Sequence, residues 1–408
     1  MPGRIADNAL AARGRLSHEW AARRMGTIER IVNANMRVQP LADMRLGFCL
    51  HITKETSVLA IAAKSLGAKV AICSANPLSA QDDIAAFLYG ERIHVYARRG
   101  ETREQYRQCI RDVIAFKPSI VTDDGSDLHV ASHQQRIKSI LGGTEETTSG
   151  VKRLAALEKA GKLLYPVIVV NNARTKYLFD NRHGTGQSTL DGILRATDVS
   201  LAGKNVVVCG YGWVGKGVTT RARGMGAIVT VTEVDPVRAI EAKMDGFIVS
   251  KLSDAARSGD IFVTCTGQTG VIRKEHFIKM KDGAILANAG HFDVEIDVDA
   301  LYATGRPAQV RPNVERFIVN GKRLFLLSKG RVVNLVAAEG NQPEVMALSF
   351  ANQLLSILHV AKNYEKMERK VYAVPEKIDD QVARYALDAM GISIDELTEE
   401  RRRYQEST

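Results

Sequence analysis

The chain has 408 residues, 45% of them hydrophobic, which is enough for two or three domains with well-buried cores. We find no apolar run near the ~20 residues that cross a bilayer and no apolar N-terminal signal. The formal net charge of +10 does not indicate a nucleic-acid partner, because the basic clusters are interleaved with acids and no basic–aromatic alternation offers a stacking platform. The five cysteines lack Cys-x-x-Cys spacing, so we expect reduced thiols in a cytoplasmic protein. Because no apolar run could cross a bilayer, we also expect no membrane partner.

The first half of the chain predicts an α/β domain. Residues 1–40 and 56–66 have helical spacing of apolar residues. Strand-like runs cover residues 45–50, 69–73, 119–122 and 164–170. Strands that alternate with helices imply a parallel sheet.

A glycine-rich loop halfway along the chain separates two further strands, residues 205–209 and 227–233. Gly210 permits a tight turn, Gly212 lets the backbone approach a pyrophosphate, and Gly215 lets the next helix pack closely on the strand. This order of strand, glycine turn, helix and strand predicts a dinucleotide site.

The residues that follow the turn support NAD as the cofactor. Trp213 and Val214 begin the helix whose N-terminus attracts the pyrophosphate. Glu233, a little over 20 residues after Gly210, can accept hydrogen bonds from the ribose and repel a 2′-phosphate, which favours NAD over NADP. A P-loop is the competing interpretation, but Gly217 stands where Ser or Thr would bind Mg²⁺.

The remaining segments complete a two-domain prediction. Strand-like runs at 260–266 and 284–288 end in polar residues that should lie at the cofactor cleft. A helix over 345–360, an extended piece to Pro375 and a charged helical end follow. We predict a Rossmann-type doubly wound NAD-binding domain (186–340), a discontinuous α/β substrate-binding domain (1–185 and 341–390), and a helical tail (391–408) that serves as an oligomer contact.

Four polar segments could carry chemistry: residues 51–56, 122–125, 144–150 and 171–186. Three of them follow predicted strand ends, where an α/β domain binds its ligand. Taken singly, helix caps, a turn or a core histidine explain each segment equally well. His129 and His133 share a helical face, but no third ligand is evident, so we predict no metal.

Together these segments resemble the S-adenosylhomocysteine hydrolase family, in its shorter archaeal and bacterial form, over nearly the whole chain. The matching stretches are residues 49–56, 81–82, 123–128, 145–150, 176–181, 210–217, 232–236, 290–297 and 331–335. The resemblance implies a homotetramer that uses retained NAD to hydrolyse S-adenosylhomocysteine to adenosine and homocysteine. The steps implied are oxidation of the ribose 3′-hydroxyl, loss of the 5′ thiol, addition of water and re-reduction.

The resemblance also implies residue roles. Lys176 and Asp180 would bind the 3′-hydroxyl, and the positive nicotinamide could lower the pKa of Lys176. Glu146 would hold the ribose hydroxyls. Asp124, His51 and His291 would serve the proton transfers at C4′ and C5′. The other substrate contacts implied are Thr53 and Glu55 at adenine, Gln81, Thr147, the gate residue Phe292, and Asn341. The NAD contacts implied are Thr147, Thr148, Asn181, Gly210, Gly212, Trp213, Val214, Gly215, Glu233, Asn288 and Asn334.

One departure from the family pattern is prominent. Asn341 follows Gly340 where the pattern has histidine, and asparagine cannot titrate near neutral pH. Three hypotheses remain open: ordinary hydrolysis of S-adenosylhomocysteine, the same oxidation and elimination on another adenine nucleoside such as 4′,5′-dehydration of a free 5′-hydroxyl, or a silent NAD-binding regulator.

Overall fold

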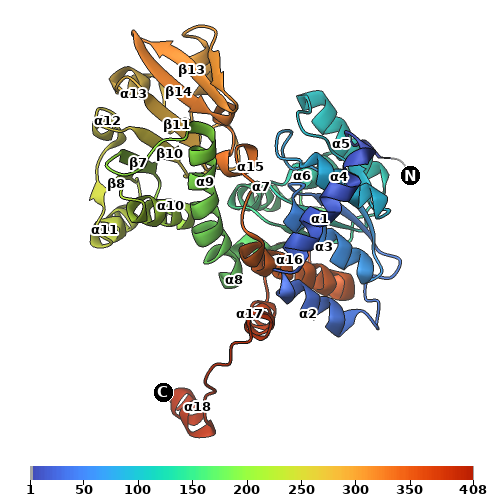
Figure 1. Cartoon of the computed structure of the whole chain (residues 1–408). Helices are drawn as coiled ribbons and strands as arrows, with labels where there is room; N and C mark the ends of the chain where they lie inside the picture. Colours follow the sequence, from blue (N-terminus) through green and yellow to red (C-terminus); the bar gives the residue numbers. More distant parts are fainter. Residues whose placement is uncertain (1–2, 408) are drawn as a thin grey trace.

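Two sheets organise the chain, and each carries helices on its faces (Figure 1). The computed structural model describes residues 3–407. The seven-stranded sheet has the order β15-β6-β5-β4-β1-β2-β3, and all of its pairs are parallel. Its strands are β1 (Arg45–Cys49), β2 (Lys69–Cys73), β3 (His94–Tyr96), β4 (Ile120–Asp123), β5 (Gly142–Glu145), β6 (Val167–Val169) and β15 (Val371–Ala373). We call the body around it the first domain.

The helices of the first domain come from both ends of the chain. They are α1 (Ala11–Ala22), α2 (Gly26–Asn35), α3 (Lys54–Ser65), α4 (Asp82–Gly90), α5 (Arg103–Ala115), α6 (Asp127–Gln134), α7 (Thr148–Lys159), α8 (Arg174–Tyr177), α16 (Pro343–Asn363) and α17 (Glu376–Met390). The chain therefore leaves this domain after α8 and returns to it with α16, and β15 pairs with β6 at the sheet edge.

The eight-stranded sheet defines the second domain, with the order β12-β13-β14-β11-β10-β7-β8-β9. Its strands are β7 (Asn205–Cys209), β8 (Ile228–Thr232), β9 (Ile248–Val249), β10 (Ile261–Thr264), β11 (Ala284–Asn288), β12 (Ala308–Arg311), β13 (Val314–Val319) and β14 (Lys322–Leu327). The run β9-β8-β7-β10-β11-β14 is parallel and has the doubly wound order, with its switch point beside β7. The predicted α/β class is confirmed.

The helices of the second domain include the one predicted after the glycine turn. They are α9 (Thr185–Thr197), α10 (Trp213–Gly224), α11 (Pro236–Met244), α12 (Leu252–Ala255), α13 (Lys274–Lys279), α14 (Val298–Tyr302) and α15 (Val333–Val336). Beyond both domains, α18 (Glu399–Glu406) stands away from the body (Figure 1). The tail predicted as helical from residue 391 is thus helical only from Glu399, and residue 408 lies outside the described part.

Helix α16 forms the core of the first domain. The segment Pro343–Lys366 is long and apolar enough to cross a membrane by length and composition, but 67% of its most apolar window is buried inside the protein. Phe350, Leu354 and Ile357 pack into the main core of this domain. The helix also buries a polar stripe of Ser349, Asn352, Gln353 and Ser356, which needs partners inside the fold.

Side chains join the two domains besides the two chain crossings. Arg99 donates to the carbonyl oxygen of Val336 at 2.7 Å, and Lys54 pairs with Glu339 at 2.9 Å. Gly125 of the first domain packs against His291 of the second, since a Cβ added at Gly125 would lie only 2.4 Å from Nε2 of His291. The two domains therefore meet closely along one face.

Candidate active site

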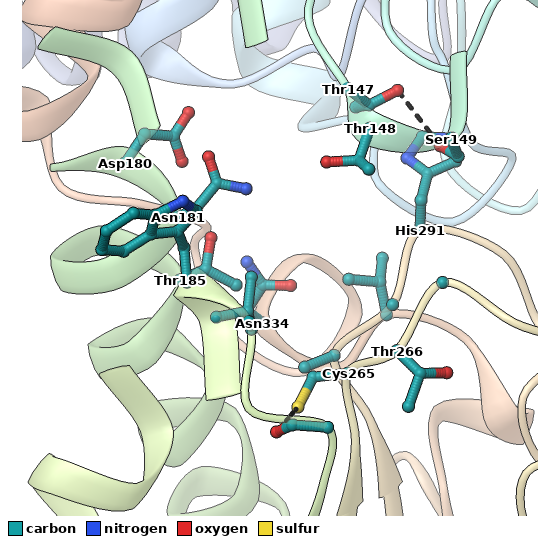
Figure 2. A pocket seen from close by; sticks show the side chains of 18 of the residues that line it. Thr147, Thr148, Ser149, Asp180, Asn181, Thr185, Cys265, Thr266, His291 and Asn334 are labelled. Atoms are coloured by element: carbon teal, nitrogen blue, oxygen red, sulfur yellow. Dashed lines mark hydrogen bonds between the residues drawn. The ribbon is translucent and has the colours of Figure 1, made fainter. Parts of the chain in front are cut away.

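A cavity of about 770 Å³ lies between the two domains and receives side chains from both. In Figure 2, Thr147, Thr148 and Ser149 of the first domain lie beside His291 of the second, and Asn181 lies opposite them. The predicted site residues that line this cavity are His51, Thr53, Glu55, Asp124, Glu146, Thr147, Thr148, Lys176, Asp180, Asn181, Gly210, Gly212, Trp213, Val214, Glu233, His291, Asn334 and Asn341. Residues far apart in sequence thus converge where strand ends meet.

Four predicted residues do not line the cavity, and two of them support the turns around it. Oε1 of Gln81 accepts from the backbone N–H of Lys54 at 3.2 Å, next to the start of α3. Gly215 lies under the glycine turn, and a Cβ there would be 2.0 Å from the carbonyl oxygen of Gly210. Its predicted packing role explains this position.

The other two residues outside the cavity are Asn288 and Phe292. The buried amide of Asn288 donates to the carbonyl oxygens of Gly290, Phe292 and Gly330 at 2.9–3.1 Å and accepts from the N–H of Gly290. Its amide therefore holds the loop that carries His291. The ring of Phe292 packs edge-on against His291, with centroids 4.5 Å apart.

One group in the cavity combines a buried ammonium with two carboxylates. Nζ of Lys176 lies 3.2 Å from Oδ2 of Asp180 and 3.6 Å from Oε1 of Glu146, and it donates to Oδ1 of Asn181 at 3.1 Å. Burial alone would lower the pKa of Lys176, but Asp180, Glu146 and Asp124 together raise it. Among the protein's own groups, opposite charges therefore outweigh desolvation. The lowered pKa expected from sequence depends on bound nicotinamide and stays a prediction.

Sequence reasoning missed two residues that hold this group, both on α16. Ser349 donates its hydroxyl hydrogen to Glu146, and its Oγ lies 3.2 Å from Oδ2 of Asp180. Gln353 donates to Oε2 of Glu146 at 2.5 Å. Burial nevertheless raises the pKa of Glu146 to about 7. The available signal was a stripe of polar residues along a helix that is otherwise rich in apolar residues.

A second group brings two histidines to one carboxylate. Nε2 of His51 is 3.5 Å from Oδ2 of Asp124, and Nδ1 of His291 is 3.4 Å from its Oδ1. A hydrogen bond of 2.7 Å joins Nδ1 of His51 to the hydroxyl of Ser79. Burial lowers the pKa of His51 to about 4, so its imidazole is neutral at pH 7. Neutral imidazole beside a carboxylate can accept and return protons.

Glu145 lies in one of the four polar segments, but no role was predicted for it. It accepts from the backbone N–H of Gly125 and of Thr147 at 2.9 Å, and from the hydroxyl of Ser126 at 2.6 Å. These bonds tie the Asp124 turn to the Glu146 turn. Asp123, His129 and Glu145 lie close enough for a cation, but hydrogen bonds already occupy the oxygens of Glu145.

Thr53 and Glu55, the residues predicted to contact adenine, follow the end of β1. Thr53 caps α3 by accepting from the N–H of Thr56. Glu55 is 1% exposed, and burial raises its pKa although Lys54 lies 3.3 Å from its Oε1. A buried carboxyl group at a cavity wall suits an amino group of a ligand, because a bound donor would replace lost water.

The glycine turn fits a dinucleotide. Gly210 has φ +102, a conformation that side chains rarely adopt. Glu233 is held at the end of β8 by accepting from the N–H of Tyr211 at 2.7 Å and of Val234 at 2.6 Å. Oδ1 of Asn334 is buried with no hydrogen-bond partner among the described residues, and a ligand in the cavity could supply one.

Comparisons with known proteins agree with this geometry. Residues 3–138 match the family model described as S-adenosyl-L-homocysteine hydrolase, and residues 181–340 match its NAD binding domain. The adenosylhomocysteinase of Sulfolobus acidocaldarius is 53% identical over 407 residues, covering 99% of this chain and 98% of the relative. That of Aquifex aeolicus is 51% identical over 410 residues, covering 99% and 98%.

Among solved structures, the NAD+-bound 3-phosphoglycerate dehydrogenase of Entamoeba histolytica is 14% identical, with a TM-score of 0.44, over 81% of this chain and 98% of that one. The chain belongs to the S-adenosyl-L-homocysteine hydrolase family, and its residues 181–340 are that family's NAD-binding domain.

Proposed function

We propose that this protein hydrolyses S-adenosyl-L-homocysteine to adenosine and L-homocysteine with retained NAD. The observation that carries the proposal is the arrangement of the Lys176 and Asp124 groups in one cavity with the glycine turn. The Lys176 group can bind and deprotonate a ribose hydroxyl, and the Asp124 group can remove a proton from carbon. Full-length adenosylhomocysteinases at 53% identity support the substrate.

In this proposal residues 1–185 and 341–390 bind the nucleoside and residues 186–340 bind NAD. Bound NAD supplies the hydride acceptor that lets the ribose 3′-hydroxyl become a ketone. Lys176, as an ammonium, donates to the 3′-oxygen while the hydroxyl proton passes to the carboxylate of Glu146, and Asp180 holds Lys176 beside the ribose. The buried cluster excludes water from this step.

The ketone makes the proton on C4′ acidic, and Asp124 with its two histidines removes it. Homocysteine then leaves from C5′ with a proton from the same group, and water adds to the double bond in the reverse sense. Neutral His51 can take up either proton. The net reaction consumes one water molecule and leaves the cofactor in its original state.

A nucleoside panel analysed by mass spectrometry tests the proposal. S-adenosylhomocysteine should yield homocysteine and adenosine. A protein that releases no homocysteine but converts adenosine to a product lighter by one water would instead be a dehydratase, and the proposal would be wrong.

We further propose that the protein is a homotetramer and that it is cytoplasmic. The exposed apolar residues Ile394 and Leu397 before α18 support a contact between subunits.

Replacing Glu233 with glutamine should weaken the preference for NAD over NADP by about 10-fold or more, because a carboxylate beside a 2′-phosphate is a like-charge contact. Both oxygens of Glu233 accept from backbone N–H groups, so glutamine keeps an acceptor on one side only. Competition between the two cofactors for the apoprotein measures the ratio. Glu275→Gln, at an exposed site in the same domain, is the control, and an unchanged ratio in Glu233→Gln would contradict the assignment.

The kcat/KM of the free enzyme should rise as pH increases through about 7. Burial raises the pKa of Glu146 to about 7, so the group is neutral below that pH and gains the charge that pairs with Lys176 above it. His51 has a pKa lowered to about 4 and stays neutral across this range. A pH series on the wild type and Glu146→Gln checks this, since glutamine should remove the limb near pH 7; a limb that persists in the variant would assign it elsewhere.

A further inference from the structure

Asn341 lies where the chain crosses back from the second domain to the first. It sits between α15 and α16, and the other crossing, residues 180–188, passes beside it. A Cβ at Gly184 would lie 2.9 Å from Cγ of Asn341, so the first crossing packs directly on the amide plane. The two crossings therefore meet at one side chain.

The amide of Asn341 makes four contacts with protein groups. Its Nδ2 donates to Oδ1 of Asp180 at 2.5 Å and to Oγ1 of Thr185 at 3.1 Å. Its Oδ1 accepts from Oγ of Ser188 at 2.7 Å and from Nδ2 of Asn334 at 3.4 Å. A primary amide has two donor hydrogens and two acceptor lone pairs, so these contacts use its full capacity.

The orientation of the amide follows from its partners. The carboxylate of Asp180 pairs with Lys176, and an ionised carboxylate can only accept hydrogen bonds. The NH₂ group must therefore face Asp180, and the oxygen must face Ser188. Although Asn341 borders the cavity, no polar atom of it is left for a purine.

These contacts determine how Asp180 is held. Asn341 occupies Oδ1, while Lys176 and Ser349 lie 3.2 Å from Oδ2. Asp180 also begins the π-helical turn Asp180–Gly184, a rare geometry that is frequent at functional sites. The position of the Asp180 carboxylate against Lys176 thus depends on a donor from the other crossing.

We propose that Asn341 is a positioning residue for oxidation of the 3′-hydroxyl: it fixes Asp180 against Lys176, joins the two crossings, and does not recognise the purine. This inference rests on the proposed function. Because an amide does not titrate near neutral pH, its hold on Asp180 is constant with pH. Histidine has only two ring nitrogens for bonding and could not reproduce all four contacts.

The test uses the NAD-loaded enzyme and the absorbance of reduced nicotinamide after rapid mixing with adenosine. Asn341→Leu has nearly the same shape but no polar atom, and it should slow this oxidation by about 10- to 100-fold. The dissociation constant for adenosine should change by less than about 3-fold, because no purine contact is lost. Asn341→His keeps an N–H for Asp180 and should recover part of the rate, with a further pH dependence from the imidazole in addition to the one expected from Glu146 in the wild type.

A purine analogue separates positioning from recognition. The ratio of oxidation rates for adenosine and 7-deazaadenosine should be equal in the wild type and in Asn341→Leu. A ratio that changes in the variant, or an oxidation rate that does not, would overturn the inference. Gln342→Ala is the matched control, since Gln342 makes no side-chain capping bond to α16.

Folding and the proposed function are checked separately. Thermal unfolding and NAD content show whether Asn341→Leu is intact; if it is not, Asn341→His carries the test, and wild-type rates and pH dependence in that variant would refute positioning. A wild type that neither reduces NAD with adenosine nor releases homocysteine would refute the proposed function, and with it this inference. Normal wild-type turnover with unaltered Asn341 variants would refute the inference alone.

Discussion

Lys176→Ala is expected to lower kcat by about 10²- to 10⁴-fold, the range that a positioned acid–base group contributes. Lys176 is 3% exposed, and its ammonium lies between the carboxylates of Asp180 and Glu146. Without it, no donor remains between them to stabilise the 3′-oxygen as the hydroxyl proton leaves. Rapid mixing with adenosine should therefore show almost no reduced nicotinamide.

The same substitution should also change stability. Removing one member of a buried ion cluster leaves uncompensated charge, which costs about 3–5 kcal/mol; uptake of a proton by Glu146, whose pKa burial already raises to about 7, would offset part of this cost. Lys159→Ala, at an exposed position in the last turn of α7, is the control. A Lys176→Ala enzyme with normal cofactor reduction would contradict the role proposed for the ammonium.

The parallel strands around the glycine turn were predictable because their local signals agree with the fold. Strands β7 and β11 begin and end where the apolar runs do, and the glycine turn lies between β7 and α10. Gly217, which argued against a P-loop, also has a packing reason: a Cβ there would lie 1.9 Å from the carbonyl oxygen of Arg182. Local pattern and tertiary contact require the same residue.

Strand β5 was not predicted, since its sequence has low strand propensity. Gly142 and Gly143 begin it, and glycine is depleted in strands. An added Cβ at Gly143 would lie 2.4 Å from Cε1 of His129. Packing against α6, which is non-local, selects the glycine, so no local pattern could show the strand.

The candidate site divides in the same way. Residues that follow predicted strand ends, such as His51 and Asp124, were predictable because topology places strand ends together. Ser349 and Gln353 were not, because they reach the site from a helix about 200 residues later in the chain. Such a contact depends on how α16 returns to the first domain, which no single motif records.

Asp124→Asn should separate the two halves of the reaction. Its carboxylate lies between His51 and His291, apart from the Lys176 ion pairs, which are made with Asp180 and Glu146. Asparagine has the same shape but cannot take a proton from carbon. We expect oxidation of adenosine to continue while release of homocysteine falls by about 10²- to 10⁴-fold.

The variant should accumulate reduced nicotinamide, since the ketone forms but cannot proceed to elimination. Exchange of the C4′ hydrogen of adenosine with deuterium from the solvent, followed by mass spectrometry, should stop in Asp124→Asn and continue in Asp282→Asn, an exposed control paired with Arg323. Lys176→Ala should lose both the reduced cofactor and the exchange, because the ketone is needed to make that hydrogen acidic. The two variants therefore differ in cofactor state, and a common response in both would mean that one group, and not two, carries the chemistry.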